Sequence, residues 1–202
     1  EFNVITGVPA IPVILEGENH RFSGNFFGVL PSGNTDFNVT AIPENSGNFE
    51  GFIEVGRAGN NTVIGVDGDG VNDAEERNVF GGTLPENQGG YDHSLEFYGQ
   101  TPGTNIVVSG NYIGVGVDGV TRFNNSVAPL NAAGAAAQYR FGSDMDGVSD
   151  DVEGNVVYNN WPESSVADAI RSFFDELNET GIVSVRGNRL VNNYTPPVNP
   201  LK

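Results

Sequence analysis

The sequence predicts an all-β fold in which short strands are wound into a solenoid. Three observations predict it: long internal repeats, short segments rich in β-branched and aromatic residues, and Gly or Asn between these segments. Repetition over tens of residues is typical of architectures in which each unit packs against its neighbours. Gly and Asn tolerate the left-handed backbone angles of sharp corners. Short strands joined by such corners favour a wound chain over one large sheet.

The repeats are two units that alternate along the chain. GNFFGVLPSGNTDFN, which begins at Gly24, aligns with GNYIGVGVDGVTRFN, which begins at Gly110. IGVDGDGVNDAEERNVF, which begins at Ile64, aligns with FGSDMDGVSDDVEGNVV, which begins at Phe141. A weaker echo of these units, GNRLVNN, begins at Gly187. Their order predicts that equivalent corners of the winding carry equivalent sequences.

Three strings carry a resemblance to a known family: GNNTVIG ending at Gly65, ERNVFGG ending at Gly82 and SGNYIG ending at Gly114. They resemble the coils of bacterial right-handed parallel β-helix repeat proteins, and the likeness covers roughly residues 13–160 and 181–194. The resemblance implies parallel sheets with stacked Val, Ile, Phe and Leu inside. It also implies Asn residues stacked in hydrogen-bonded ladders, for which the candidates are Asn25, Asn78, Asn111, Asn155 and Asn188.

Two alternatives stay open at this point. The asparagines would also serve as turn residues without stacking, and a β-sandwich would also contain short strands and turn clusters. We expect one domain over residues 1–194, with insertions near residues 83–94 and 126–138 and a proline-rich tail or linker at residues 195–202. Apolar residues at helical spacing predict an amphipathic helix over residues 163–179. Because open solenoid ends expose unpaired strand edges, we expect flanking domains or self-assembly to cover them.

The charge of the chain restricts its partners. With 26 acidic residues against 9 Lys and Arg, the formal net charge is −17. Such a surface repels nucleic acid and anionic membranes, and it attracts cations. No apolar run approaches the ~18 residues that span a bilayer, so membrane insertion is not expected. The chain contains no Cys, which excludes disulfides and thiolate chemistry.

The repeated unit beginning at Ile64 and Phe141 contains a dense acidic loop. Both copies read D-x-D-G-x-x-D-x-x-E, which is similar to the latter part of the calcium-binding repeats of thrombospondin type 3 modules. Calcium takes six to eight oxygen ligands, and alternate Asp side chains in a tight loop converge on one ion. The sequence therefore predicts Ca²⁺ sites. Their candidate ligands are Asp67, Asp69, Asp73 and Glu76 in the first loop, and Asp144, Asp146, Asp150 and Glu153 in the second.

A plainer interpretation of these loops also stands. Asp-Gly is common turn chemistry, and clustered acids often form a solvated face. An EF-hand would need a ligand where Val71 and Val148 stand. Valine cannot coordinate through its side chain, but it can pack the loop into the core.

Catalytic residues are sparse. β-Helix polygalacturonases carry Gly-His-Gly and Arg-x-Lys segments, and this sequence has neither. If the protein is a polysaccharide lyase or glycoside hydrolase, the best candidates are His93 with Asp92, and the pair Asp150 and Asp151. Such an enzyme would act on an acidic polysaccharide.

Our interpretation is a secreted or cell-surface β-helix module with a non-catalytic binding, adhesive or scaffolding role. It would be calcium-stabilised, with a polysaccharide or another cell-surface molecule as partner. Exposed aromatic rings stack on sugars. The candidates for such stacking are Tyr91, Tyr98, Tyr139, Tyr158 and Trp161. For any one of these rings, packing in the core or stacking at a turn is the more common role.

Overall fold

The structure, a computed structural model, confirms the all-β class. It describes residues 2–6, 13–35, 37, 52–55, 59–81, 93–99, 103–123, 128–134, 139–159 and 183–192. Within these ranges the strands pair in parallel, and helix is limited to two turns of four residues each. Neither of these two helical turns has the length and apolar character needed to cross a bilayer.

The described strands form three sheets. The six-stranded sheet contains β1 (Val4–Ile5), β4 (Phe26–Phe27), β7 (Val79–Phe80), β10 (Tyr112–Ile113), β13 (Val156–Asn159) and β15 (Arg189–Asn192). The four-stranded sheet contains β2 (Val13–Leu15), β5 (Ile53–Val55), β8 (His93–Gly99) and β11 (Ala128–Gly134). The five-stranded sheet contains β3 (Arg21–Phe22), β6 (Val63–Gly65), β9 (Ile106–Ser109), β12 (Tyr139–Gly142) and β14 (Val183–Arg186). The helical turns are η1 (Asp73–Glu76) and α1 (Asp150–Glu153).

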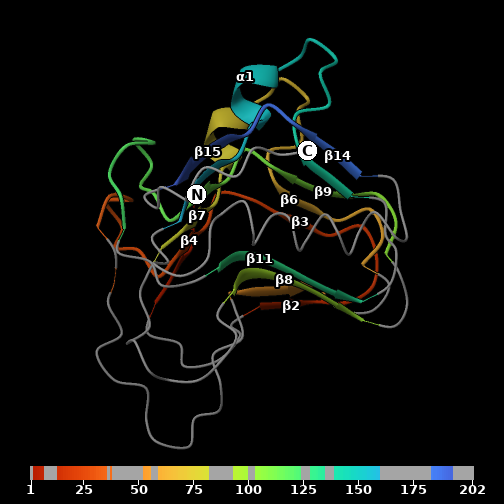
Figure 1. The fold of residues 1–202 in the computed structure, drawn as a ribbon, viewed down its shortest axis with the longest axis horizontal. Coiled ribbons are helices and arrows are strands. Elements are labelled where there is room, and N and C mark those ends of the chain that lie inside the picture. Colours follow the sequence, from red (N-terminus) through yellow and green to blue (C-terminus); the bar gives the residue numbers. More distant parts are fainter. Residues whose placement is uncertain are drawn as a thin grey trace, which may run out of the picture.

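The chain visits these sheets in rotation from β1 to β13 (Figure 1). Within each sheet a strand therefore pairs with the strands three before and three after it, so β7 lies between β4 and β10. Parallel neighbours require a crossover connection, and here the crossover runs through the other two sheets. Equivalent positions of the sequence repeats thereby lie above one another.

All three sheets contribute side chains to one interior. Phe27 and Phe80, on adjacent strands of the six-stranded sheet, stack with ring centroids 5.1 Å apart. Ile53 from the four-stranded sheet and Ile64 from the five-stranded sheet are fully buried in the same cluster. This confirms the predicted inward stacking of aliphatic and aromatic residues, which supplies most of the favourable burial in such short strands.

An asparagine ladder runs along the corner before the six-stranded sheet. Side-chain Nδ2 groups donate to the Oδ1 of the next asparagine over 2.9–3.2 Å, and four of these rungs join the predicted residues. The fifth rung joins Asn3 to Asn25 over 2.9 Å and was not predicted. The ladder residues from Asn25 to Asn155 are at most 4% exposed. The predicted stacking of Asn25, Asn78, Asn111, Asn155 and Asn188 is therefore confirmed.

A second ladder lies at the corner before the five-stranded sheet and was not predicted. Asn105 donates to Asn61 over 3.1 Å, and Asn61 donates to Asn19 over 3.2 Å. All three are exposed and have a φ between 53° and 62°. Asparagine adopts this left-handed conformation more readily than most residues, so the ladder also fixes the corner.

Some predicted features lie outside the described residues, and others differ from the structure. The helix at 163–179 and the tail at 195–202 lie outside the described residues. The supposed insertions near 83–94 and 126–138 are in part regular structure, because β8 begins at His93 and β11 spans Ala128–Gly134. These two strands pair with each other from His93 and Ala128 to Gly99 and Gly134. Their compositions conceal the strands, since β11 is rich in Ala and contains a Pro.

Candidate functional site

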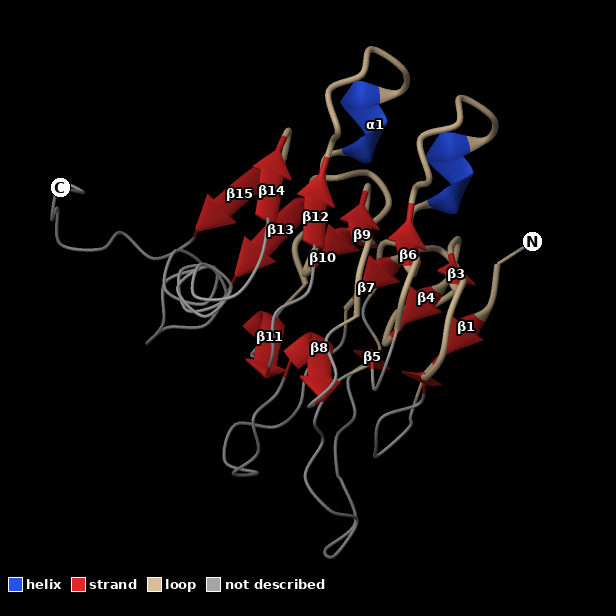
Figure 2. Ribbon diagram, turned by 90° about the vertical axis from the view of Figure 1, so that its right-hand side faces the viewer, coloured by secondary structure: helices blue, strands red, loops and turns tan. Residues whose placement is uncertain are grey.

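Two acidic loops project from one edge of the molecule. The first (residues 67–76) joins β6 to β7 through η1, and the second (residues 144–153) joins β12 to β13 through α1. Figure 2 shows the two helical turns side by side beyond the ends of the strands, with η1 as the unlabelled one. The sequence repeats therefore place two similar loops at equivalent corners.

Each of the four predicted carboxylate ligands in the first loop accepts a hydrogen bond from a backbone N–H of the same loop. Asp67 and Asp69 each accept a hydrogen bond from the backbone N–H two residues later, at 3.2 and 2.8 Å. Asp73 Oδ2 accepts from the N–H three residues earlier at 3.1 Å, and Glu76 Oε2 accepts from the N–H of Asp67 at 3.1 Å. The second loop repeats all four bonds at 2.8–3.2 Å. Turn chemistry thus accounts for one oxygen of each of these carboxylates.

An arginine from the five-stranded sheet joins the first and last acids of each loop. Arg21 pairs with Asp67 and Glu76. Arg140 pairs with Asp144 at 2.7 Å and with the buried Glu153 at 3.0 Å. These partners were missed from the sequence. Arg21 is far from its loop in the chain and reaches it only because β3 and β6 are neighbours in the sheet.

The structure gathers three carboxylates in each loop, although not the same three. Asp67, Asp73 and Glu76 each offer an oxygen within 4.8 Å of the others in the first loop. In the second loop the three are Asp144, Asp146 and Asp150. The four-residue sets predicted from the sequence are thus brought together in part, without Asp69 in the first cluster or Glu153 in the second.

The two clusters differ in exposure. Asp73 is only 5% exposed, whereas Asp144 and Asp146 are exposed. Desolvation by burial raises the pKa of Glu76, while the hydrogen bond from Asp67 N–H lowers it. A negative charge in the first cluster is therefore less well solvated than one in the second.

The valines of the loops do not insert into the core. Val71 is 60% exposed and Val148 is 43% exposed. The packing into the core that valine would allow is therefore not observed, and the backbone N–H of each valine instead donates to the Asp two residues earlier.

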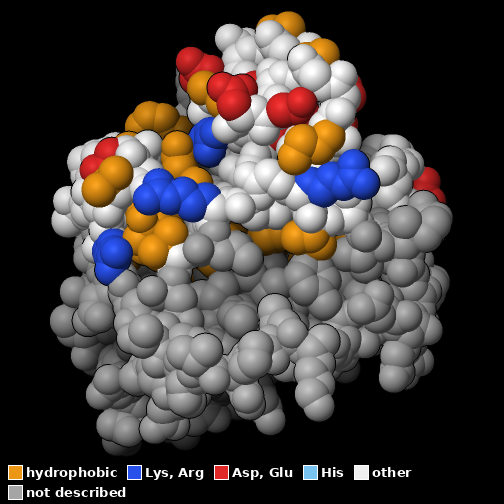
Figure 3. Space-filling model, turned by 45° about the horizontal axis from the view of Figure 1, so that its top comes forward, with side chains coloured by type: hydrophobic (Ala, Val, Ile, Leu, Met, Phe, Trp, Pro, Cys, Tyr) orange, Lys and Arg blue, Asp and Glu red, His pale blue; other side chains and the backbone are white. Residues whose placement is uncertain are grey.

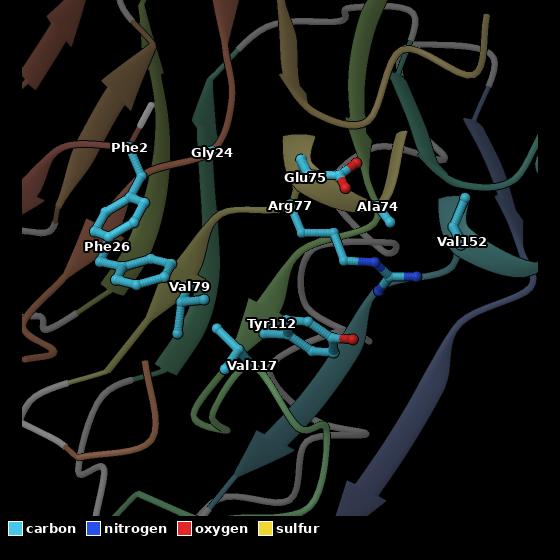
Figure 4. Close-up of a pocket in the computed structure, with 10 residues that line it drawn as sticks. All are labelled: Phe2, Gly24, Phe26, Ala74, Glu75, Arg77, Val79, Tyr112, Val117 and Val152. Carbon is cyan, nitrogen blue, oxygen red and sulfur yellow. The ribbon is translucent and has the colours of Figure 1, made fainter. Parts of the chain in front are cut away.

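A pocket of about 500 Å³ opens on the outer face of the six-stranded sheet (Figure 4). The first residue of β4 and of β10 faces outward because the second faces the core, and this places Phe26 and Tyr112 in the pocket wall. Phe2 stacks on Phe26 with ring centroids 4.7 Å apart. The helical turns complete the wall with Glu75 from η1 and Val152 from α1.

Arginines lie over aromatic rings on this face. The Arg77 guanidinium sits 4.8 Å above the centre of the Tyr112 ring and donates to the carbonyl oxygen of Gly110 at 3.2 Å. Burial lowers the pKa of Arg77, and Tyr112 and Asp151 raise it. Figure 3 shows arginine side chains among hydrophobic ones below the protruding acidic part. The pocket thus combines aromatic faces with both signs of charge.

Family models, curated proteins and solved structures give no match to this chain. The geometry of the loops and the pocket is therefore the basis for any function.

The aromatic residues predicted to meet sugars are not those that line the pocket. Tyr158 is 5% exposed and Tyr139 is 9% exposed, so neither offers a ring face to a ligand. Burial raises the pKa of Tyr139 to about 12, and this ring packs edge-on against Phe97. Tyr91, Trp161 and the side chain of Tyr98 lie outside the described residues. The signal that was missed is the aromatic residue directly after a ladder asparagine, as in Asn25-Phe26 and Asn111-Tyr112.

The described candidate catalytic residues lie in different elements of the fold. His93 begins β8 in the four-stranded sheet, whereas Asp150 and Asp151 lie in α1 after the five-stranded sheet. Asp150 accepts hydrogen bonds from Ser143 Oγ at 2.8 Å and from a backbone N–H at 3.0 Å. Asp92 lies outside the described residues. The catalytic assignment stays a prediction.

Proposed function

We propose that this protein is a non-catalytic module, secreted or displayed at a cell surface, that binds a carbohydrate chain in an adhesive or scaffolding role. The observation that carries the proposal is the pocket on the outer face of the six-stranded sheet, whose walls present Phe2, Phe26 and Tyr112. Aromatic faces pack against the apolar faces of sugars. Arg77 and Glu75 supply a donor and an acceptor for sugar hydroxyls at the same pocket.

The scaffold we propose is a right-handed parallel β-helix. The rotation of the chain through three parallel sheets and the rungs of asparagine at one corner support it. In such a solenoid each coil packs mainly on its neighbours. The outer residues of successive strands then form a continuous strip that suits an extended polymer.

Retention on polysaccharides tests this role. We expect the protein to be retained by at least one member of a panel of neutral and acidic polysaccharides, with no release of new chain ends. Tyr112→Ala should weaken retention about tenfold, equivalent to about 1.4 kcal/mol, because the half-buried Tyr112 ring lines the pocket beside Arg77. Affinity electrophoresis measures the retention, and reducing-end release measures cleavage.

Val120→Ala is the matched control, because this residue is 67% exposed and does not line the pocket. Cleavage of any polymer would overturn the non-catalytic role and favour a polysaccharide lyase or glycoside hydrolase. Equal retention of the Tyr112→Ala variant and the parent would remove the pocket from the proposal.

We also propose that Ca²⁺ stabilises the module through at least one of its two acidic loops. The support is the convergence of three carboxylate oxygens within 4.8 Å in each loop. A ligand that binds only the folded state at 100 times its Kd adds about 2.7 kcal/mol to the free energy of unfolding. We therefore expect chelation to lower the Tm by about 5 °C or more, as measured by differential scanning calorimetry. A Tm that is the same in Ca²⁺ and in chelator would contradict this stabilisation.

A further inference from the structure

We infer that the two acidic loops are not equivalent, and that the first loop is the one that binds a Ca²⁺ ion, through Asp67, Asp73 and Glu76. This inference rests on the calcium dependence proposed above and specifies its site. It starts from a difference between two otherwise matching hydrogen-bond networks.

The difference lies in one carboxylate oxygen. Asp73 is 5% exposed, and its Oδ1 is buried without a hydrogen-bond partner in the described part of the chain. At the equivalent position of the second loop, Asp150 Oδ1 accepts a hydrogen bond from Ser143 Oγ at 2.8 Å. Val66 occupies the position of Ser143 in the first loop and has no hydroxyl to offer. A buried carboxylate oxygen without a partner is costly, and a bound ion is one of its ordinary explanations.

The charge of the first cluster suits a divalent cation. Asp67, Asp73 and Glu76 carry three negative charges when ionised, and the paired Arg21 supplies one positive charge. Two negative charges therefore remain. The three ligand atoms of this cluster are carboxylate oxygens, which suit Ca²⁺ better than they suit softer metals.

Burial separates the two loops further. Asp73 is buried and its partners Asp67 and Glu76 are half-buried, whereas Asp144 and Asp146 of the second cluster are exposed. An ion is attracted more strongly where water screens less. The second cluster also has less need of an ion, because the serine hydroxyl already satisfies Asp150.

The inferred site is joined to the pocket through η1. This turn contains Asp73 and Glu76, and its two middle residues, Ala74 and Glu75, line the pocket. A cation that holds both ends of η1 would fix this part of the wall. Removal of Ca²⁺ should then weaken polysaccharide retention as much as loss of the Ca²⁺ site in the first loop does.

Calcium titration of metal-stripped protein, residues 1–202, tests the inference. We expect isothermal titration calorimetry to give about one Ca²⁺ per chain. Asp73→Asn should weaken binding at least about tenfold, whereas Asp150→Asn should bind Ca²⁺ as the parent does. Circular dichroism in chelator identifies variants that are simply unfolded.

A second pair of variants leaves every carboxylate in place. Val66→Ser introduces the missing hydroxyl beside Asp73 and should weaken Ca²⁺ binding, also by about tenfold. Ser143→Val removes the hydroxyl beside Asp150 and should strengthen binding at the second loop. An unfolded Asp73→Asn variant would thus leave the inference testable through these two substitutions.

Three results would overturn the inference: two equivalent Ca²⁺ per chain, loss of binding in Asp150→Asn but not in Asp73→Asn, or no binding at all. In the last case Asp73 Oδ1 would be satisfied by water. These three results concern Ca²⁺ binding only. The non-catalytic role is tested separately, and cleavage of a polysaccharide is the result that would overturn it.

Discussion

Asn111→Ala is expected to lower the free energy of unfolding by about 3 to 5 kcal/mol. Asn111 is fully buried at the centre of the ladder. Its Nδ2 donates to the carbonyl oxygens of Ile64 and Ser109 and to Asn155 Oδ1, at 2.9–3.1 Å. Its Oδ1 accepts from the side chain of Asn78 at 3.0 Å. Alanine leaves several of these buried groups without a partner, each at about 1 to 3 kcal/mol.

Urea unfolding followed by circular dichroism measures this change. Asn61→Gly is the control, because Asn61 belongs to the exposed ladder and glycine keeps its left-handed backbone conformation. We expect the control to cost less than about 1 kcal/mol. Equal losses in the two variants would show that the buried ladder stabilises the fold no more than the exposed one does.

Gly65→Ala is expected to lower the free energy of unfolding by about 3 kcal/mol or more. Gly65 has a φ of 102°, and a Cβ atom there would lie 1.9 Å from the carbonyl oxygen of Ser109 and 2.7 Å from Asn111 Oδ1. Alanine adds about 1 to 2 kcal/mol of backbone strain in this region and a further 1 to 3 kcal/mol of overpacking. The clash also displaces the buried ladder.

Gly147→Ala separates strain from clash. Gly147 has a similar φ of 92°, yet a Cβ atom there meets nothing within 4 Å. We therefore expect only the strain of about 1 to 2 kcal/mol, again measured by urea unfolding. Gly142 is the repeat equivalent of Gly65, with a Cβ position 2.0 Å from the carbonyl oxygen of Arg186. Gly142→Ala should lower the free energy of unfolding as much as Gly65→Ala does. If either variant lost no more stability than Gly147→Ala, the clash of the added Cβ atom with the neighbouring carbonyl oxygen would be excluded at that site.

The sequence predicts the fold where its signals are local. A ladder asparagine directly precedes a strand of two to four residues. The equivalence of Asn25-Phe26-Phe27 and Asn111-Tyr112-Ile113 is therefore visible in the sequence itself. The same pattern predicts the core, because the inward residue of each short strand is apolar. The strand β11 was missed, since its Ala-rich segment has weak intrinsic preference for a strand and is held by its pairing with β8.

The candidate site depends more on contacts between distant residues. The repeated acids were evident in the sequence, but the role of Arg21 depends on the lateral pairing of β3 with β6. The exchange of Gly68 for Met145 between the loops also has a structural reason. A Cβ atom on Gly68 would lie 2.2 Å from Glu153 Oε1, which reaches over from the second loop. Glycine at this position therefore leaves the Glu153 carboxylate in place on Arg140.

The asparagine ladder gives the protein a mechanical direction. Every side-chain donor from Asn3 to Asn155 points to the asparagine of the following corner, so the amide dipoles add along the column. Because rungs connect only adjacent corners, peeling the terminal coil away breaks the terminal rung while the other rungs stay paired. We therefore expect a chain that is peeled from one end to unwind coil by coil, with an extension that rises in steps.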